Sequence, residues 1–312
     1  MTGLTHALVL TAGIGTRLRP LTEVRAKPAI PVAGEPMIRR ITRWLAGHGV
    51  PDIVLNLHHR PETISGVVGD GSDLSVRVRY SWEQPLLLGT AGGPRHALPL
   101  VGAATFLLLN GDVLTDLDLA ALAEAHAASG ARITMALVPN REPHRYSGVR
   151  LDRAGRVIGF APRGEADGSY HFIGPQIVRS DVFATLPDGQ PASSVGGLYD
   201  ETIAADPDAI RGFVCDAGYW DVGTVGDYWS TSWSFAGREG STDVISGRHV
   251  QIAPTARVSR SILWDDIEVS PGAVLDECVV TDGVRVPAGA RHRRRILLRG
   301  PEGTLLDSPL TL

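Results

Sequence analysis

Apolar residues between positions 252 and 290 recur at a spacing that few folds can accommodate. Two series, four residues apart, each advance in steps of 6, 5, 6, 6, 5 and 6 residues. The series are Ile252, Val258, Leu263, Val269, Leu275, Val280, Val286 and Ala256, Ile262, Ile267, Ala273, Val279, Val284, Ala290. Three steps sum to 17 residues, and three short strands per turn with small residues at the corners indicate a parallel β-helix. The alternative is an irregular β tail. So short a solenoid needs a cap or a partner subunit, so we expect a homo-oligomer.

The preceding part of the chain alternates short apolar runs with amphipathic stretches. We expect strands at 7–10, 53–57, 76–80, 106–109 and 133–138, and helices from 36 to 47 and from 117 to 128. This order predicts an α/β fold, with a mostly parallel, Rossmann-like sheet covered by helices and ligands at the carboxyl ends of its strands. The expected domains are 1–236 and 248–312, joined by a polar linker over 237–247.

Composition excludes several classes of protein. The formal net charge is −4 and the pI is near 6.2, so no general basic field recruits nucleic acid or an anionic membrane. No apolar run approaches a membrane span, and the N-terminus lacks signal-peptide features. Cys215 and Cys278 match no metal spacing and are expected to be free thiols. These features predict a cytoplasmic protein.

The glycine-rich segment after the first expected strand is the strongest indication of chemistry. Backbone N–H groups of such a turn can approach a polyphosphate. The segment lacks the third glycine of the dinucleotide fingerprint, since Leu18 stands at that position. It also lacks the phosphate-loop pattern, in which Ser or Thr follows the lysine, because Pro28 follows Lys27. It instead supplies Arg17 and Lys27 as cations, which suits a nucleoside triphosphate that loses pyrophosphate. Of the 30 basic residues Lys27 is the only lysine, which indicates a site where a compact charge is needed.

The segment from Leu10 to Met37 resembles the signature of sugar-1-phosphate nucleotidyltransferases, the nucleotide-sugar pyrophosphorylases, in which a Gly-x-Gly-Thr-Arg-Leu loop precedes Lys-Pro. The resemblance continues through Leu-Gly-Thr-Ala-Gly-Gly at 88–93, Asn-Gly-Asp at 110–112, Tyr-Ser-Gly-Val at 146–149 and Gly-Tyr-Trp-Asp-Val-Gly-Thr at 218–224. A β-helical tail also occurs in this family, where it is left-handed. The resemblance therefore makes 1–236 the catalytic domain and 248–312 a left-handed, hexapeptide-repeat β-helix.

The resemblance implies a reaction in which a sugar-1-phosphate oxygen attacks the α-phosphorus of an NTP and pyrophosphate leaves. Asp112 and Asp221 resemble the two aspartates that bind Mg²⁺ in the family, and Asp112 is also a catalytic residue. Arg17 resembles the arginine that grips the pyrophosphate, and Lys27 the lysine between the reacting phosphates. Considered alone, each aspartate would be interpreted as a turn or helix-cap residue, and Arg17 would be interpreted as a solvated cation in a loop.

Nucleotide contacts are implied for a larger set of positions, in which backbone groups and one side chain read the base. Glu83 would suit the paired N–H donors of guanine, whereas Gln84 would complement uracil or thymine; either can instead be a surface loop residue. The set is Ala12, Gly13, Gly15, Thr16, Arg17, Lys27, Glu83, Gln84, Gly89, Thr90 and Gly111.

The sugar side departs from the common family pattern. Phe-Ala-Pro-Arg-Gly at 160–164 stands where many members have Glu-Lys-Pro, and Phe-Ile-Gly at 172–174 where many have Asn-Ala-Gly. We expect Gly148, Arg163 and Gly174 to contact the sugar phosphate. A modified sugar, an altered pose or lost activity would each explain the departures.

The leading substrates by resemblance are GTP and mannose-1-phosphate. A uridylyltransferase or thymidylyltransferase for another sugar-1-phosphate, an amino-sugar phosphate among them, is the first alternative. A regulatory subunit that binds nucleotide-sugars without turnover is the second. Arg17, Lys27, Asp112 and Asp221 favour an enzyme, while the altered sugar motifs favour the regulator.

Overall fold

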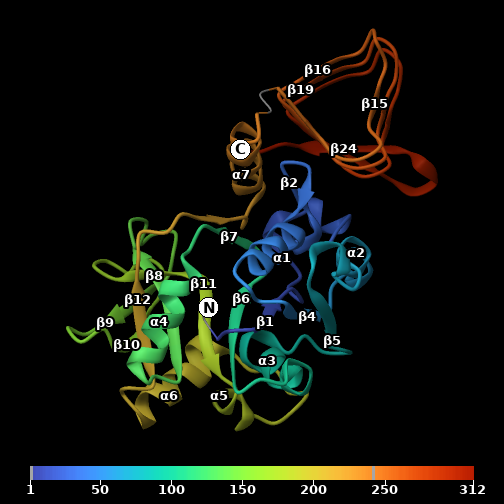
Figure 1. Ribbon diagram of the computed structural model, residues 1–312. Coiled ribbons are helices and arrows are strands. Elements are labelled where there is room, and N and C mark those ends of the chain that lie inside the picture. Colours follow the sequence, from blue (N-terminus) through green and yellow to red (C-terminus); the bar gives the residue numbers. More distant parts are fainter. Residues whose placement is uncertain (1–2, 241–242) are drawn as a thin grey trace. The chain divides into compact units, whose positions relative to one another are not determined.

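The computed structural model describes residues 3–240 and 243–312 (Figure 1). Its contacts divide the chain into two compact units. The first contains Met1–Gly13 and Ile41–Tyr219, and the second contains Ile14–Arg40 and Trp220–Leu312. The glycine-rich segment therefore groups with the C-terminal part of the chain, although it follows the first strand directly.

The first unit is built on a mixed β-sheet. Its parallel half has the order β5-β4-β1-β6 and confirms four of the predicted strands. The strands are β1 (His6–Leu10), β4 (Asp52–Leu57), β5 (Arg77–Trp82) and β6 (Thr105–Asn110). β1, β4 and β6 are rich in buried apolar residues, as strands covered on both faces require, whereas the edge strand β5 buries Val78 and Ser81.

The other half of the sheet departs from parallel order. β11 (Tyr170–Arg179) runs antiparallel to both β6 and the predicted strand β8 (Ile133–Pro139), and β12 (Ile210–Val214) runs parallel to β8. The antiparallel pair β9 (Gly148–Leu151) and β10 (Val157–Ala161) attaches to β11. The short β7 (Val113–Thr115) follows β6.

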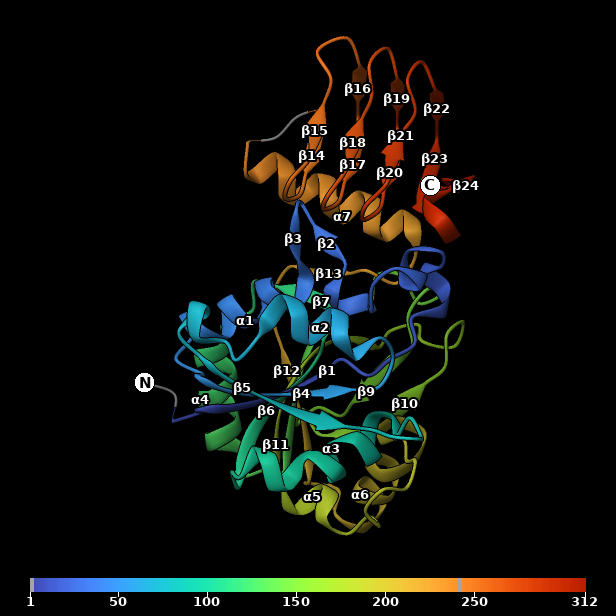
Figure 2. The same ribbon diagram turned by 90° about the vertical axis from the view of Figure 1, so that its right-hand side faces the viewer.

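Helices cover both faces of this sheet. Figure 2 shows α2 (Pro61–Val68) on one side of the parallel strands and α3 (Gly89–Val101) with α5 (Asp181–Ala184) on the other. The predicted helix α4 (Leu119–Ser129) begins where the Asp118 carboxylate accepts two backbone N–H groups and ends at Gly130, whose φ is +65°. α6 (Tyr199–Ala205) follows a π-type turn at Ser194–Leu198, and Ser72–Leu74 forms a 3₁₀ turn. The predicted helix α1 (Met37–Gly47) is also present.

The second unit begins with three 3₁₀ turns and a small hairpin. The turns are Thr16–Leu18, Leu21–Glu23 and Lys27–Ala29, and the hairpin pairs β2 (Pro31–Val32) with β3 (Glu35–Pro36). β13 (Tyr219–Asp221) leads to α7 (Val225–Arg238). A capping box between Thr224 and Asp227 fixes the start of α7.

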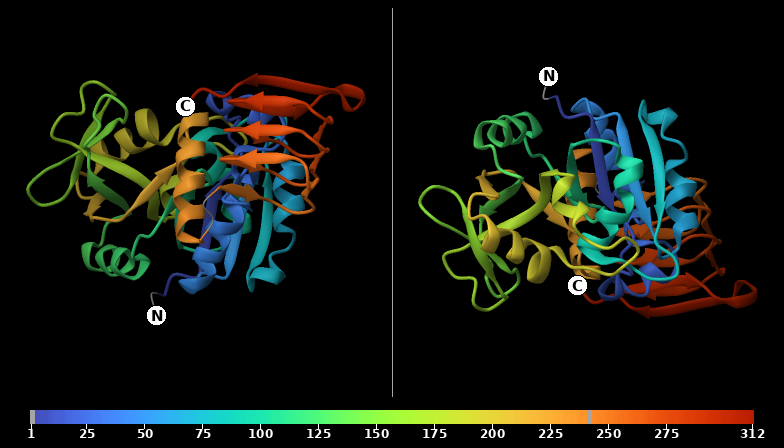
Figure 3. Two further views of the ribbon diagram at one scale, coloured as in Figure 1. Left: turned by 90° about the horizontal axis from the view of Figure 1, so that it is seen from above. Right: turned by 90° about the horizontal axis from the view of Figure 1, so that it is seen from below.

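A parallel β-helix completes the second unit and confirms the predicted repeat. Each strand pairs with the one 17 positions further on, as in Ile245 with Ile262 and Val269 with Val286 (Figures 2 and 3). The first of three sheets comprises β14 (Val244–Ser246), β17 (Ser261–Leu263), β20 (Val279–Val280) and β23 (Arg295–Arg299). The second comprises β15 (Gln251–Ile252), β18 (Glu268–Val269) and β21 (Arg285–Val286). The third comprises β16 (Arg257–Ser259), β19 (Val274–Asp276) and β22 (Arg291–Arg293).

The ends of the β-helix differ from the simple repeat. After a 3₁₀ turn at Pro301–Gly303, β24 (Leu305–Pro309) folds back antiparallel to β23. β14 already lies inside the predicted linker 237–247, and α7 extends into it as far as Arg238. Positions 241–242 of that linker lie outside the described residues.

Two expectations from composition have a structural counterpart. Cys215 and Cys278 are free thiols. Within 3–240 and 243–312, every helix is too short or too polar to cross a lipid bilayer.

Candidate active site

The carboxyl ends of the parallel strands in the first unit are linked by a buried hydrogen-bond network. The Asn56 side chain accepts the backbone N–H of Thr11 at 2.6 Å and donates to Oε1 of Glu83 at 2.7 Å. The Thr11 hydroxyl in turn donates to the backbone carbonyl of Asn56. The network sets the course of the chain as it leaves β1, β4 and β5.

The network revises the role expected for Glu83. Its side chain is only 1% exposed, and its second carboxylate oxygen accepts the N–H of Leu88 at 2.7 Å. Both oxygens are engaged inside the protein, so this carboxylate supports the loop instead of presenting acceptors to a base. Gln84 is exposed and donates weakly to the carbonyl of His58 at 3.5 Å.

The motif at 88–93 is explained largely by packing. A Cβ on Gly93 would lie 2.5 Å from Oε1 of Glu83, and one on Gly92 would lie 2.4 Å from a backbone oxygen, so no larger residue fits. Gly89 has φ +76°. The Thr90 hydroxyl accepts the N–H of Ser194 at 2.9 Å. Sequence reasoning missed Thr11 and Asn56, although a buried polar residue at the end of an apolar strand is a usable signal.

Asp112 lies in the turn that follows β6. The N–H of Gly111 donates to the carbonyl of Leu10 at 2.9 Å, which ties this turn to the end of β1. Gly174, at φ +108° in an irregular part of β11, packs on the other side, where a Cβ would lie 3.9 Å from Cβ of Asn110. The predicted residues Gly111, Asp112 and Gly174 therefore come together in the first unit.

In the second unit the glycine-rich turn packs on the only lysine. Gly15 has φ +67°, and a Cβ there would lie 3.2 Å from Cβ of Lys27 and 2.8 Å from Cγ2 of Thr22. The Thr22 hydroxyl donates to the carbonyl of Gly15 at 3.0 Å. Lys27 is 8% exposed, so its carbon stem is enclosed by this turn. Thr16 and Arg17 are exposed just beyond it.

Three charged side chains meet around Gly223 in the second unit. A Cβ at this position would lie 3.3 Å from Oδ2 of Asp221, 3.3 Å from Oδ2 of Asp227 and 3.6 Å from Nη2 of Arg17. Oδ2 of Asp227 also accepts the N–H and the hydroxyl of Thr224. The structure thus brings Arg17 and Asp221 together although they are about 200 positions apart. Asp227 was not foreseen, and its place in the capping box was the available signal.

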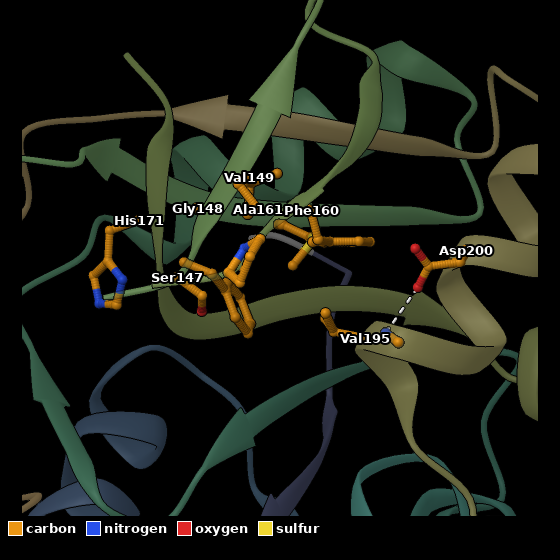
Figure 4. Close-up of a pocket in the computed structure, with 12 residues that line it drawn as sticks. Ser147, Gly148, Val149, Phe160, Ala161, His171, Val195 and Asp200 are labelled. Atoms are coloured by element: carbon orange, nitrogen blue, oxygen red, sulfur yellow. Dashed lines mark hydrogen bonds between the residues drawn. The ribbon is translucent and has the colours of Figure 1, made fainter. Parts of the chain in front are cut away.

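A pocket of about 380 Å³ opens in the first unit beside β8, β9, β10 and β11 (Figure 4). Val149, Phe160, Ala161 and Phe172 are among its apolar lining residues. Figure 4 shows Asp200 on one side of the pocket and Ser147 with His171 on the other. Five of these seven side chains lie in the segments 146–149, 160–164 and 172–174 that the sequence analysis singled out, although it did not name them as contacts, and it missed His171 and Asp200.

Of the three residues expected to contact a sugar phosphate, only Gly148 lines this pocket. A Cβ on Gly148 would lie 2.0 Å from the hydroxyl oxygen of Ser169, so packing behind the pocket already requires glycine. Arg163 lies exposed in the turn after β10 and is not a lining residue.

His171 is uncharged at neutral pH. Burial lowers its pKa to about 4, outweighing a hydrogen bond with the Ser147 backbone that raises the pKa. Its ring lies 4.1 Å from the ring of Tyr146 and 5.0 Å from that of Tyr219. The Arg145 guanidinium lies 4.9 Å from the ring centre of Tyr146, on the border of this aromatic cluster.

The model of the family described as "Nucleotidyl transferase" matches residues 6–236. The chain belongs to this family. The match confirms the resemblance identified from the sequence, and the protein is a nucleotidyltransferase enzyme.

Curated relatives of this nucleotidyltransferase carry several specificities. It is 31% identical to "Mannose-1-phosphate guanylyltransferase" of Mycobacterium tuberculosis over 91% of this chain and 81% of that protein. It is 29% identical to "UTP–glucose-1-phosphate uridylyltransferase" of Synechocystis over 90% of this chain and 76% of the relative. It is 36% identical to "N-acetylmuramate alpha-1-phosphate uridylyltransferase" of Neisseria meningitidis over 62% and 81% of the two chains.

Solved structures share its fold. The crystal structure of HddC from Yersinia pseudotuberculosis superposes with a TM-score of 0.65 at 22% identity, over 74% of this chain and all of that chain. A putative glucose-1-phosphate thymidylyltransferase from Bacillus anthracis, crystallised with sucrose, gives a TM-score of 0.64 at 20% identity over 74% and 95% of the two chains.

The donor chemistry of this nucleotidyltransferase suits Mg²⁺. Among the residues that the structure describes, no three His, Cys, Asp or Glu side chains gather as a metal site. Mg²⁺ is commonly held by one or two carboxylates together with substrate phosphates. Asp112, half-buried in the turn after β6, and Asp221, half-buried at the end of β13, each carry such oxygen ligands.

Proposed function

We propose that this enzyme is a sugar-1-phosphate nucleotidyltransferase that makes an NDP-sugar and pyrophosphate, with GTP and mannose-1-phosphate as the leading substrates. The observation that carries the proposal is the meeting of Arg17 and Asp221 around Gly223, because a cation and a carboxylate are both needed where a triphosphate reacts. The Mycobacterium tuberculosis relative, similar along 91% of this chain, supports the substrate pair.

In this reaction a sugar phosphate oxygen forms a bond to the α-phosphorus, and the bond to the pyrophosphate oxygen breaks. Both reactants are anionic, so positioning and charge neutralisation supply most of the rate. Arg17 holds the departing pyrophosphate and Lys27 neutralises the reacting phosphates. Asp112 and Asp221 would hold Mg²⁺, which would offset further negative charge on the phosphates.

The remaining predicted nucleotide contacts stay part of the proposal in modified form. Backbone groups of Ala12 and Gly13, at the end of β1, contact the nucleotide, and Gly15, Thr16 and Gly111 contact phosphates. Glu83 positions this loop through Asn56, and Gly89 and Thr90 hold the 192–194 segment. Gly148, Arg163 and Gly174 remain the proposed sugar-phosphate contacts.

One observation favours a second base. Gln84 is exposed, whereas both carboxylate oxygens of Glu83 accept hydrogen bonds inside the protein. A glutamine amide pairs with the adjacent donor and acceptor of uracil or thymine. A uridylyltransferase or thymidylyltransferase is therefore the second candidate function.

Release of pyrophosphate from GTP, UTP and dTTP with a panel of sugar-1-phosphates tests these alternatives. Turnover with any pair, abolished by EDTA and restored by Mg²⁺, is the expected result. Binding of nucleotide-sugars without turnover of any pair would contradict the proposal and favour a regulatory subunit.

The wider setting follows from the same proposal. With NTP and a sugar-1-phosphate as substrates, we expect the enzyme to act in the cytoplasm, and we expect neither nucleic acid nor a membrane as a partner. Residues 1–236 act as the catalytic domain, 237–247 as linker and 248–312 as the β-helix. A homo-oligomer through the β-helix would be detected as a mass above 33.2 kDa in light scattering.

A further inference from the structure

The pocket of Figure 4 has walls that do not match a fully hydroxylated sugar. Val149, Phe160, Ala161 and Phe172 present hydrocarbon to its interior. A hydroxyl buried against such walls loses its bonds to water without replacement, whereas a methyl group gains from burial.

The polar side chains of the pocket supply no positive charge. Neither lysine nor arginine is among its lining residues. One carboxylate oxygen of Asp200 accepts the N–H of Gly196, in the turn before α6, at 2.8 Å. His171 is neutral and packed on Tyr146.

β11 connects the pocket to the turn that carries Asp112. Phe172 lines the pocket, and Gly174, two residues further along β11, would place a Cβ 3.7 Å from Cβ of Val113 and 3.9 Å from Cβ of Asn110. A substrate whose phosphate reacts beside Asp112 therefore has this pocket next to it for the rest of its sugar.

We propose that the sugar-1-phosphate of this enzyme carries a methyl group that packs against Phe160, Phe172 and Val149. Two kinds of sugar supply such a group, namely a deoxy-hexose and an N-acetylated amino sugar. The inference rests on the proposed function, which it makes more specific.

Matched sugar pairs with each NTP test the inference. One arm compares 6-deoxymannose-1-phosphate with mannose-1-phosphate, and the other compares N-acetylglucosamine-1-phosphate with glucose-1-phosphate. The methylated member of at least one pair is expected to have a kcat/KM about 10-fold or more higher. The arm that shows the preference identifies the source of the methyl group.

Two variants locate the effect. Phe172→Asn introduces polar groups into the wall and is expected to reduce the preference to about threefold or less. Ile158→Ser, on the exposed part of β10 and outside the pocket lining, is the control and should keep the parental ratio. A folded Phe172→Asn protein, checked by its thermal melt, that keeps the full preference would overturn the inference.

The two levels of proposal fail in different ways. If hydroxylated sugars react as well as their methylated partners, the methyl-binding role is wrong and the proposed function stands. If no sugar-1-phosphate releases pyrophosphate, the proposed function is wrong and this inference falls with it.

Discussion

Lys27 shows how one residue links composition to chemistry. It is the only lysine in the chain, and its stem is enclosed by the turn at Gly15. The guanidinium of an arginine is a larger planar group that cannot take the place of a compact ammonium in such a space. Composition raised this question, and the structure shows that the stem of Lys27 is buried.

Lys27→Arg is expected to lower kcat by about 100-fold, because charge stabilisation at the phosphates depends on position. Pyrophosphate release measures the loss. The matched control is Arg19→Lys, at an exposed position just after the Thr16–Leu18 turn, which should keep the parental rate. A Lys27→Arg enzyme as fast as the parent would show that the lone lysine is a compositional accident.

Glu83 and Gln84 are neighbours with opposite expected behaviour. Glu83→Gln replaces a buried acceptor oxygen with an N–H₂ donor, which would face the donor group of either Asn56 or Leu88. The free energy of unfolding should therefore fall by about 2 kcal/mol. Gln84→Ala should leave the thermal melt unchanged and raise KM for the NTP. Unaltered stability of Glu83→Gln would contradict the structural role assigned here.

His171 makes stability depend on pH. Its pKa is lowered from 6.5 to about 4, so below pH 6.5 the unfolded chain binds a proton that the folded chain does not. Its contribution is complete above pH 6.5 and declines as pH falls toward 4, by about 2 kcal/mol at pH 5. His171→Phe should flatten this acid decline in denaturant titrations from pH 7 to 5. Burial also lowers the pKa of His126, so this residue maintains part of the dependence of stability on pH in both the parent and the His171→Phe protein.

Among the elements, the segment carrying Lys27 is fastened to the β-helix by a buried ion cluster. Arg25 donates to Asp282 at 2.6 and 2.7 Å and to Asp265 at 2.8 Å, and its guanidinium lies 5.5 Å from the ring centre of Trp264. Trp264 donates to the hydroxyl of Tyr228 in α7 at 2.9 Å. The β-helix therefore braces the residues around Lys27.

Arg25→Ala is expected to lower the free energy of unfolding by about 3 kcal/mol, because two carboxylates lose their buried partner. It should also lower kcat at temperatures well below the melting temperature, since Lys27 is two residues away. Arg248→Ala is the control. Arg248 also pairs with Asp265 but is 72% exposed, so we expect a change under about 1 kcal/mol and an unchanged rate. Equal effects of the two substitutions would contradict the bracing role.

Local periodicity made most elements predictable, whereas long-range pairing did not. The 17-residue register was readable because every coil repeats the same burial pattern. The antiparallel course of β11 was not, because an apolar strand looks alike in either direction. The Arg25–Asp282 pair joins positions 257 residues apart, and the local sequence around either residue does not predict it. The burial of Glu83 was not predictable for the same reason, since it depends on contacts with Asn56 and Gly93.

For the whole molecule, the central claim concerns residues drawn from distant parts of the chain. Asp112 belongs to the first unit, while Arg17, Lys27 and Asp221 belong to the second. Family motifs predicted a role for these residues from the sequence. The sequence pointed to the segments 160–164 and 172–174 of the apolar pocket, but their meeting with Asp200 and the turn at Val195 was not predictable, because these residues are far apart in the chain.

The most direct test is the affinity for Mn²⁺, used as a probe for Mg²⁺, in the presence of a non-hydrolysable NTP analogue. We compare the parent with Asp112→Asn, Asp221→Asn and the double variant. If both carboxylates bind one ion, each single change should weaken Mn²⁺ binding by about 10-fold to 100-fold, and their effects in the double variant should not be independent. A single variant with parental affinity, or two losses that simply multiply, would contradict the account.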